Sequence, residues 1–392
     1  MNTQLFNSEV QCFIQENLKN NLNNLVLKGS PFPEVSTQEL AQQIEGKQKA
    51  KKKLPLWFKT ENIYYPKKLN LEQTSSESTA LYKAKLIFGE SIIDLTGGFG
   101  IDCTFFSEFF KEVHHCEMNS ELSDIVTSNC QRLNIKNIIT HKGDSLKVIK
   151  NLNKKFDWIY IDPSRRNDIK GKVFLLNDCL PNVPNNLDAF FEYSDQILIK
   201  ISPILDITST INELKFVKEI HIIALENEVK ELLFILEKGY ADTIIINTIN
   251  ILKEKKQSFC FEYGSTQQGR YGLAENYLYE PNAAIMKSGG FQEVSSQLNL
   301  AKLHQHSHLY TSTELYKDFP GRIFKIDAVL NYDKKKIMKL LPDKKANITT
   351  RNFPETVAQI RKKTKIKDGG NIYLFFTTNI ENNKKVLACS KL

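Results

Sequence analysis

The sequence predicts an α/β protein: a parallel sheet covered by helices, preceded by a helical region and followed by a smaller α+β module. Three observations predict this. Apolar strand patterns alternate with helical patterns from residue 81 onward. Glycines and acidic residues follow several of these strands, at the positions where parallel sheets hold their ligands. A second, shorter alternation begins after residue 320.

The composition is that of an ordinary soluble protein with two or three domains. The chain has 392 residues, of which 41% are hydrophobic and 25% are charged, and this length suffices for several cores. It has no run of about 18 apolar residues and no basic segment followed by an apolar one at its start. We therefore expect a cytoplasmic protein without a membrane segment. The seven scattered cysteines contain no Cys-x-x-Cys pair, so no metal is expected.

Residues 1–80 are expected to form an N-terminal helical region. The helical pattern breaks at residues 29–33, because Gly-Ser-Pro-Phe-Pro cannot continue a helix. The region 81–265 then carries the main alternation, which produces parallel strands whose carboxyl ends meet at one edge. Strands are expected at 91–95, 112–117, 137–142, 156–162, 196–202 and 219–225, and helices at 101–110, 120–133, 145–151, 208–217 and 227–238. Two β-rich runs, 242–251 and 257–263, are expected to pair as an antiparallel hairpin.

The loop after the first strand points to the cofactor. From Ser91 to Asp102 the chain reads Ser-Ile-Ile-Asp-Leu-Thr-Gly-Gly-Phe-Gly-Ile-Asp, and its glycines let the backbone turn sharply and approach a ligand closely. In a dinucleotide fold the amides of the next helix face a pyrophosphate, so acids would be poorly placed there. Asp94 and Asp102 instead suit a ligand with an ammonium group and a sulfonium centre. The loop therefore predicts S-adenosylmethionine (SAM).

Acidic residues also end the next three strands. Glu117 follows the second strand, where a carboxylate binds the ribose hydroxyls in SAM and NAD folds alike, and Met118 is expected beside the adenine. Asp144 follows the third strand, where it either accepts from the adenine amino group or only caps the next helix. The predicted cofactor-binding residues here are Asp94, Thr96, Gly97, Gly98, Gly100, Asp102, Glu117, Met118, Asp144 and Ser145.

The segment after the fourth strand, Asp162-Pro163-Ser164-Arg165-Arg166, predicts the reacting end of the site. The proline fixes the backbone next to the acid and removes a donor. Methyl transfer from SAM depends mainly on alignment and electrostatics, and Asp162 is expected to orient or deprotonate an amino nitrogen. The two arginines would pair with a nucleic-acid phosphate or with neighbouring acids. We predict Asp162, Pro163, Arg165 and Arg166 as the catalytic residues.

The excess positive charge lies at the C-terminal end. Residues 321–392 hold 17 Lys/Arg and 6 Asp/Glu, a net charge of +11, while the whole chain carries +8. This asymmetry is typical of a phosphate-binding module on a neutral catalytic body, although a lysine-rich solvated face would look the same. Strands are expected here at 322–330, 346–352, 371–378 and 385–390, and helices at 334–341 and 355–363. The predicted RNA-binding residues are Lys344, Lys345, Arg351, Arg361, Lys362 and Lys363.

Several strings together resemble a known family. They are Leu71-Glu72-Gln73-Thr74-Ser75-Ser76-Glu77 within 64–80, the glycine loop 94–100 and the segment 162–166, continued by the strings at 279–287, 351–354 and 365–370. With them the chain resembles the bacterial class I SAM-dependent methyltransferases that carry a C-terminal THUMP-like domain. The resemblance spans nearly the whole chain.

The resemblance implies a domain order and a partner. A Rossmann-like class I methyltransferase domain at 81–265 would be followed by a ferredoxin-like unit at 273–320 and a THUMP-like RNA-binding domain at 321–392. In related RNA-modifying enzymes this pairing binds structured RNA, so tRNA or rRNA is the expected partner. The resemblance also implies that the helix containing Gln73 to Thr79 lies across the SAM pocket, which adds Gln73 and Thr79 to the expected cofactor-binding residues.

Other chemistries are weighed against this one. RNA uracil C5 methyltransferases share an Asp-Pro-x-Arg-like motif but need a cysteine after the next strand, where this chain has Lys200-Ile201-Ser202-Pro203. N-methylation of a base is therefore expected, with Cys179 as the remaining alternative nucleophile. An NAD-linked oxidoreductase stays open, although Cys103 takes the third glycine position of that motif. An RNA-binding protein with a vestigial cofactor site stays open as well.

Overall fold

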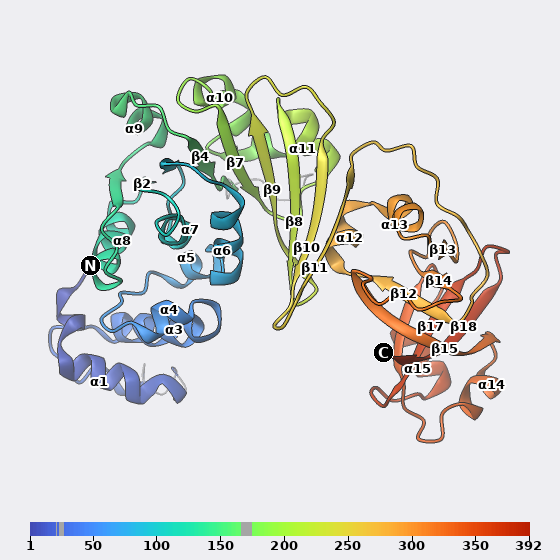
Figure 1. Cartoon of the computed structure of the whole chain (residues 1–392). Helices are drawn as coiled ribbons and strands as arrows, with labels where there is room; N and C mark the ends of the chain where they lie inside the picture. The colour runs from blue at the N-terminus through green and yellow to red at the C-terminus, as the bar shows by residue number, and fades with distance from the viewer. Residues whose placement is uncertain (21, 23–26, 166–174) are drawn as a thin grey trace. The chain divides into compact units, whose positions relative to one another are not determined.

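The computed structural model describes residues 1–20, 22, 27–165 and 175–392 (Figure 1). The chain divides into two compact units, and each is described by itself. The first comprises 1–218 and 233–241, and the second comprises 219–232 and 242–392. The division falls inside the region 81–265 that the sequence predicts as one domain.

The N-terminal region of the first unit is helical. Its helices are α1 (Ser8–Glu16), α3 (Thr37–Lys53), α4 (Pro55–Lys59), α5 (Lys68–Gln73) and α6 (Glu77–Leu86), with short 3-10 turns at η1 (Thr3–Phe6) and η2 (Asn17–Lys19). Residues 29–33 are not helical, as their glycine and prolines predict. Helix α3 begins with a capping box, in which Ser36 and Glu39 satisfy each other's backbone amides. Helix α6 continues beyond residue 80, the predicted end of this region.

Nine strands form the main sheet, in the order β11-β10-β8-β9-β7-β4-β1-β2-β3. The strands are β1 (Ser91–Asp94), β2 (Glu112–Glu117), β3 (Ile138–Lys142), β4 (Trp158–Ile161), β7 (Gln196–Ile201), β8 (Val217–Leu225), β9 (Glu228–Glu237), β10 (Ile245–Ile251) and β11 (Lys256–Glu262). The first five pair in parallel, and the helices between them are α7 (Ile101–Phe106), α8 (Ser120–Arg132), α9 (Ser145–Leu152), α10 (Val183–Phe190) and, after β7, α11 (Ile207–Glu213). The predicted parallel α/β sheet is confirmed, and β10 and β11 form the predicted antiparallel hairpin.

The helix predicted at 227–238 is wrong, because this segment is strand β9. The connection from β8 consists only of Glu226 and Asn227, with φ of 50° and 65°. Two successive positive φ angles are typical of the tight turn that joins the strands of a hairpin with a two-residue loop. Leu232, Leu233 and Phe234 are all fully buried. A strand buried on both faces has no polar alternation, so its apolar run resembles a buried helix in sequence.

The C-terminal part of the second unit contains a seven-stranded sheet in the order β13-β14-β12-β15-β18-β17-β16. Its elements are β12 (Tyr277–Pro281), α12 (Ala283–Ser288), α13 (Phe291–Gln297), β13 (Ala301–Lys302), β14 (Tyr310–Ser312), β15 (Gly321–Asn331), α14 (Lys334–Lys339), β16 (Asn347–Arg351), α15 (Val357–Thr364), β17 (Ile372–Thr378) and β18 (Lys384–Lys391). Every strand and helix predicted after residue 320 is present within a few residues of its expected bounds.

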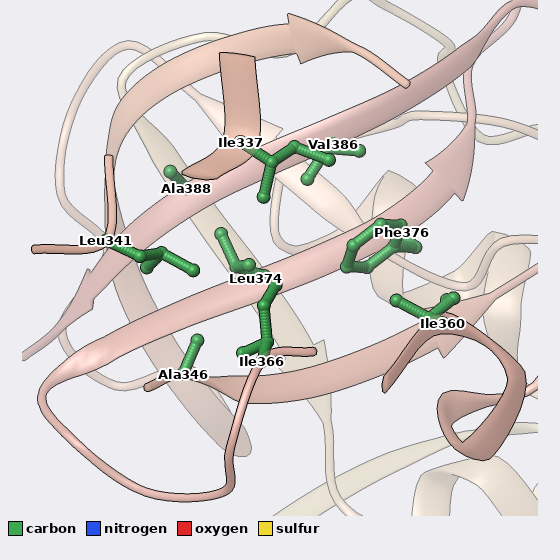
Figure 2. Close-up of a cluster of buried hydrophobic side chains, with 9 residues drawn as sticks. All are labelled: Ile337, Leu341, Ala346, Ile360, Ile366, Leu374, Phe376, Val386 and Ala388. Carbon is green, nitrogen blue, oxygen red and sulfur yellow. The ribbon is translucent and has the colours of Figure 1, made fainter. Parts of the chain in front are cut away.

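One apolar cluster holds the last of these elements together. Figure 2 shows Leu374 and Phe376 of β17 and Val386 of β18 lying against Ile337 of α14 and Ile360 of α15. All five side chains are fully buried, and burial of such side chains stabilises a fold by about 1.5–3 kcal/mol each. The cluster therefore fixes both short helices on one face of the sheet. Among the described residues no helix has the length and apolar character needed to cross a membrane.

Candidate active site

The loop between β1 and α7 is shaped by Asp94. Its Oδ1 accepts hydrogen bonds from the backbone N of Thr96 (2.8 Å) and from Thr96 Oγ1 (3.1 Å), and its Oδ2 accepts from Cys103 Sγ (3.3 Å). The residue is only 2% exposed. Asp94 therefore stabilises the loop, and both of its carboxylate oxygens accept hydrogen bonds from within the protein.

The loop glycines have separate reasons for lacking a side chain. A Cβ at Gly97 would lie 2.3 Å from His115 Nε2, and a Cβ at Gly100, where φ is 76°, would lie 2.8 Å from Val126 Cγ1. Gly98 also has a left-handed φ of 52°, but the nearest atom to its Cβ position is Thr96 O at 3.7 Å. Gly97 and Gly100 are thus required by close packing, whereas a Cβ at Gly98 would make only an ordinary contact.

Glu117, the predicted ribose-binding carboxylate, lies beside Gly98. Its Oε2 accepts from Gly98 N at 2.9 Å, and its Oε1 accepts from Asn119 N at 2.7 Å. Met118, the next residue, is 73% exposed. The end of β2 therefore presents a carboxylate and an exposed apolar side chain next to the loop.

The end of β3 reaches the same edge. Gly143 N donates to Glu117 O at 2.9 Å, which places the following Asp144 near the end of β2. Asp144 Oδ1 accepts from Lys147 N at 3.0 Å and caps α9, whose first residue is Ser145. Asp144 is thus a helix cap, as one of the two interpretations of the sequence predicts, and it uses one carboxylate oxygen for this contact.

Asp102, in the first turn of α7, lies at the centre of a buried polar network that the sequence did not reveal. Lys83 Nζ lies 3.2 Å from Asp102 Oδ1, while Ser75 Oγ (2.9 Å) and Tyr160 OH (2.8 Å) donate to Oδ2. Burial acts to raise the pKa of Asp102, but the charge of Lys83, further helped by Lys200, and these hydrogen bonds outweigh it and hold the pKa below its usual value. The helical region thus contributes Ser75 and Lys83 to the buried network around Asp102, directly after the glycine loop.

A sequence signal for Lys83 does exist. In α6 the buried positions are Thr79, Ala80, Lys83 and Ala84, a helical i, i+1, i+4, i+5 stripe. A lysine on such a stripe needs a buried partner. The predicted Thr79 keeps its hydroxyl inside the same helix start, donating to Ser76 O at 3.2 Å, and Gln73 is the exposed last residue of α5.

Substitution of Lys83 by Met is expected to lower the free energy of unfolding by about 3–5 kcal/mol, because it leaves the Asp102 charge buried without its counter-ion. Lys83 itself is fully buried. Urea denaturation measures the loss, and Lys85→Met, at an exposed position of the same helix, is the matched control. Adding Asp102→Asn to Lys83→Met should restore part of the stability. Equal effects of Lys83→Met and Lys85→Met would contradict this role.

Asp162, the predicted reacting residue, lies directly after β4. Its backbone N donates to Thr96 Oγ1 at 2.7 Å, and its carboxylate pairs with Lys200 Nζ of β7. The Asp162 side chain is one-third exposed and that of Lys200 is 12% exposed. The hydroxyl of Thr96 therefore donates to Asp94 and accepts from Asp162, and it ties the glycine loop to the segment after β4.

Lys200, the partner of Asp162, is not among the residues that the sequence predicts for the site. The register pairs Ile161 of β4 with Ile199 of β7, so the next residues, Asp162 and Lys200, stand side by side. A single lysine in the apolar run Gln-Ile-Leu-Ile-Lys-Ile was the available signal.

The other predicted catalytic residues are less informative. Pro163 is buried, and Arg165 lies in the short strand β5 (Ser164–Arg165), which pairs with β6 (Cys179–Leu180). Arg166 lies outside the described residues. Cys179 is buried, with its Sγ 3.9 Å from Leu175 O.

The predicted RNA-binding residues fall into two groups. The arginines make contacts inside the C-terminal module: Arg351 donates to Glu280 Oε1 at 3.0 Å, and Arg361 donates to the carbonyl oxygens of Ile366 (3.1 Å) and Ala346 (3.2 Å) as well as to Asp368. The lysines are exposed, and among them Lys363 lies 3.1 Å from Glu355; these residues are Lys344, Lys345, Lys362 and Lys363. The lysines rather than the arginines are placed to meet an external anion.

The pH dependence of stability is expected to report on Asp94, because burial raises the pKa of this carboxyl to about 7. Its unfolded pKa is about 3.9, so the folded state binds the proton more tightly. The associated stability is complete below about pH 4 and is lost as the pH rises through about 7. Asp94→Asn should remove this loss of stability. The difference between the Tm of the variant and that of the wild type should therefore increase from about pH 4 to about pH 7. Parallel Tm curves, as expected for the exposed control Asp188→Asn, would contradict the assignment.

Comparisons with known proteins agree with this architecture. Residues 277–320 match the model of a ferredoxin-like domain, and residues 321–391 match that of a THUMP-like domain. No curated protein matches the chain. Among solved structures, a candidate methyltransferase from Porphyromonas gingivalis W83 is 31% identical, with a TM-score of 0.87 over 98% of this chain and 97% of its own.

Two further solved structures cover less than half of the chain. An rRNA methylase from Streptococcus thermophilus is 14% identical, with a TM-score of 0.31 over 41% of this chain and 94% of its own. An O-methyltransferase from Bacillus cereus in complex with SAH is 14% identical, with a TM-score of 0.33 over 44% and 92%. The full-length match to the Porphyromonas gingivalis protein decides the family: this chain belongs to the bacterial class I methyltransferases that carry a C-terminal ferredoxin-like and THUMP-like module.

Proposed function

We propose that this protein is a SAM-dependent methyltransferase that methylates a base nitrogen in structured RNA, either tRNA or rRNA. The observation that carries the proposal is the link through Thr96, whose hydroxyl connects the glycine loop at Asp94 with the carboxylate-bearing Asp162 at the next strand end. This link fixes the position of the proposed reacting group relative to the proposed cofactor site. Membership of a methyltransferase family supports the same reading.

The residues at the loop fit SAM better than a dinucleotide. A Cβ at Gly98 would make only an ordinary contact, 3.7 Å from Thr96 O, and the Glu117 carboxylate beside Gly98 is an acceptor for ribose hydroxyls. For a dinucleotide, the helix start after the loop would have to face a pyrophosphate. Here the backbone N–H of Gly98 donates a hydrogen bond to Glu117 Oε2, and Asp102 places a negative charge in the first turn of α7. When bound, SAM supplies a methyl group on a positively charged sulfur.

Asp162 performs the protein's part of the reaction. An ionised carboxylate only accepts hydrogen bonds, so Asp162 selects a nucleophile that donates one, such as a base amino group. This hydrogen bond orients the nitrogen lone pair, and the carboxylate accepts the proton of the nitrogen in the transition state, as the new bond to carbon forms. Lys200 pairs with the same carboxylate and keeps it at the strand edge in the absence of substrate.

The RNA part of the proposal is supported by the C-terminal module. Its second segment matches a THUMP-like domain, and residues 321–392 hold 17 Lys/Arg against 6 Asp/Glu. Exposed lysines bind phosphates and release counter-ions, so the affinity for RNA should fall steeply with salt. The arginines of this module are largely used internally, which leaves lysine side chains for this role.

The test is transfer of tritium from methyl-labelled SAM to total RNA from a strain that lacks this protein, followed by mass spectrometry of the nucleosides. Label in a single methylated base of tRNA or rRNA is the expected result. Binding of SAM and of RNA without any label would identify an RNA-binding protein with a vestigial site. Enhanced NADH fluorescence together with no SAM binding in calorimetry would favour an NAD-linked oxidoreductase.

A further inference from the structure

The ion pair at the proposed reacting end joins two neighbouring strands. β4 and β7 pair in parallel, and Ile161 stands opposite Ile199, so the next residues, Asp162 and Lys200, reach the same carboxyl edge of the sheet. The Lys200 side chain is 12% exposed, and that of Asp162 is 33% exposed. A carboxylate that accepts hydrogen bonds and an ammonium group that donates them therefore lie side by side at this edge.

The nearby acids do not by themselves account for a lysine at this place. Burial acts to raise the pKa of Asp102, and the charge of Lys83, followed by that of Lys200, acts to lower it. Lys83 Nζ, however, lies 3.2 Å from Asp102 Oδ1 and is already its counter-ion. Asp162 is exposed enough to be solvated by water, whereas burying most of Lys200 costs free energy. This cost points to a role for Lys200 beyond neutralising an acid.

A positive charge beside Asp162 opposes the proposed reaction unless the substrate becomes negative. The sulfonium of SAM is positive as well, and like charges repel each other more strongly near a protein surface than in water. When an amino group attacks the methyl group, the positive charge only passes from sulfur to nitrogen, so the ammonium group of Lys200 gives no benefit. The protein must therefore gain from this charge in another way.

A lactam nitrogen, which is a ring N–H next to a carbonyl group, provides that gain. Its lone pair is delocalised into the carbonyl group, so the nitrogen becomes nucleophilic only as its proton leaves. Negative charge then develops on the carbonyl oxygen, and a cation placed at such an oxygen stabilises the transition state. Asp162 can accept the proton while Lys200 donates to the oxygen, so both members of the ion pair have a function.

We infer that the substrate base presents a lactam edge and that Lys200 is a catalytic residue that donates a hydrogen bond to its carbonyl oxygen. The inference rests on the proposed function. Guanine has such an edge in N1–H beside O6, and uracil has one in N3–H beside O4. Adenine and cytosine instead have an amino group beside a ring nitrogen without a proton. A lactam edge exchanges the contact between Asp162 and Lys200 for one hydrogen bond to each of them.

The step balances in atoms and charge. The proton of the ring nitrogen passes to the carboxylate of Asp162, and the nitrogen keeps the electron pair of the broken N–H bond. The nitrogen uses this pair for its new bond to the methyl carbon, whose bond to sulfur breaks with both electrons left on sulfur. The negative charge on the carbonyl oxygen disappears as the new bond forms. Lys200 therefore stabilises the transition state more than the bound substrate.

The first test is the position of the methyl group in RNA that the wild-type protein has labelled. Mass spectrometry of the nucleosides, with 1-methylguanosine, 3-methyluridine and amino-methylated nucleosides as standards, should place the label on a ring nitrogen next to a carbonyl group. Label on an amino group, or on a ring nitrogen of adenine, would overturn the inference and leave the methyltransferase proposal standing. RNA without any label would overturn both.

The second test is the pH dependence of Lys200→Met. At neutral pH this variant should lower kcat for RNA methylation by about 10²–10³-fold, the usual loss when one group that stabilises a developing oxyanion is removed. The loss should shrink as the pH rises, because alkali removes the lactam proton without help from the protein. Lys200→Arg keeps the charge and should restore much of the rate. A loss of equal size at every pH would show a merely structural role and would overturn the inference.

The relative affinities for SAM and SAH provide a measurement that does not depend on turnover, because SAM carries a positive charge that SAH lacks. In calorimetry, Lys200→Met should raise the affinity for SAM relative to SAH by about threefold or more, since a repelling charge is removed. Lys218→Met is the matched control: Lys218 of β8 pairs with Glu237 at 2.7 Å, and its loss should change neither this ratio nor kcat. Equal ratios in the two variants would overturn the inference.

Discussion

Asp162→Asn is expected to lower the rate of RNA methylation by about 10²–10⁴-fold, which is the usual contribution of a group that accepts a proton in the transition state. The affinity for SAM should stay within about twofold, because the backbone N of Asp162, and not its carboxylate, bonds to Thr96 of the cofactor loop. An amide side chain keeps the shape of the carboxylate but cannot take up the proton. Single-turnover incorporation of labelled methyl measures the rate, and calorimetry measures SAM binding.

The matched control for this variant is Asp188→Asn. Asp188 lies on α10 with a side chain that is 79% exposed, and it pairs with Lys215 at the surface. It undergoes the same chemical change away from the site and should retain the full rate. If Asp162→Asn keeps more than about a tenth of the wild-type rate, the carboxylate is not the proton acceptor, and alignment alone accounts for catalysis.

Gly98→Trp is expected to weaken SAM binding by about 100-fold or more, equivalent to at least about 2.7 kcal/mol. A Cβ at Gly98 would make only an ordinary contact, 3.7 Å from Thr96 O, so we expect the indole ring to fit there and to occupy the volume that the cofactor requires. The carboxylate of Glu117 bonds to this same residue's amide, and displacement of the loop would also misplace it. Calorimetry with SAM measures the effect.

Gly239→Trp provides a closely matched control for the glycine variant. Gly239 also has a left-handed φ, 82°, and no atom lies within 4 Å of its Cβ position. Both variants therefore carry the same backbone strain and the same added ring, and their Tm values should fall by similar amounts. Only Gly98→Trp should lose SAM. Equal SAM affinity in the two variants would remove the loop at Gly98 from the cofactor site.

Much of the fold follows from sequence periodicity, since each parallel strand is short, apolar and followed by an amphipathic helix. The strand β1 (Ser91–Asp94) and the elements of the C-terminal module are present within a few residues of their predicted bounds. Strand β9 was missed for a physical reason. Its hairpin turn uses Glu226 and Asn227 in place of the usual Asn-Gly pair. Its residues are buried on both faces, so neither the turn sequence nor an apolar–polar alternation indicated a strand.

The site was predictable where it depends on position along a strand. Asp94 and Glu117 end parallel strands and Asp162 directly follows one. Parallel strands bring their carboxyl ends to one edge, so the sequence could place these residues together. It could not show which carboxylate oxygens are already used. In the structure, the carboxylate oxygens of Asp94 accept hydrogen bonds from Thr96 and Cys103. Asp102 is surrounded by Lys83 and other donors.

By itself, the sequence determined the parallel α/β sheet, the glycine loop, the acidic strand ends and the basic C-terminal module, because these depend on local periodicity and on charge along the chain. Only the tertiary structure decided that Lys200 pairs with Asp162 and that Lys83 supports Asp102. These pairs are separated by 19 to 38 residues, and only strand order and helix packing bring such distant side chains together.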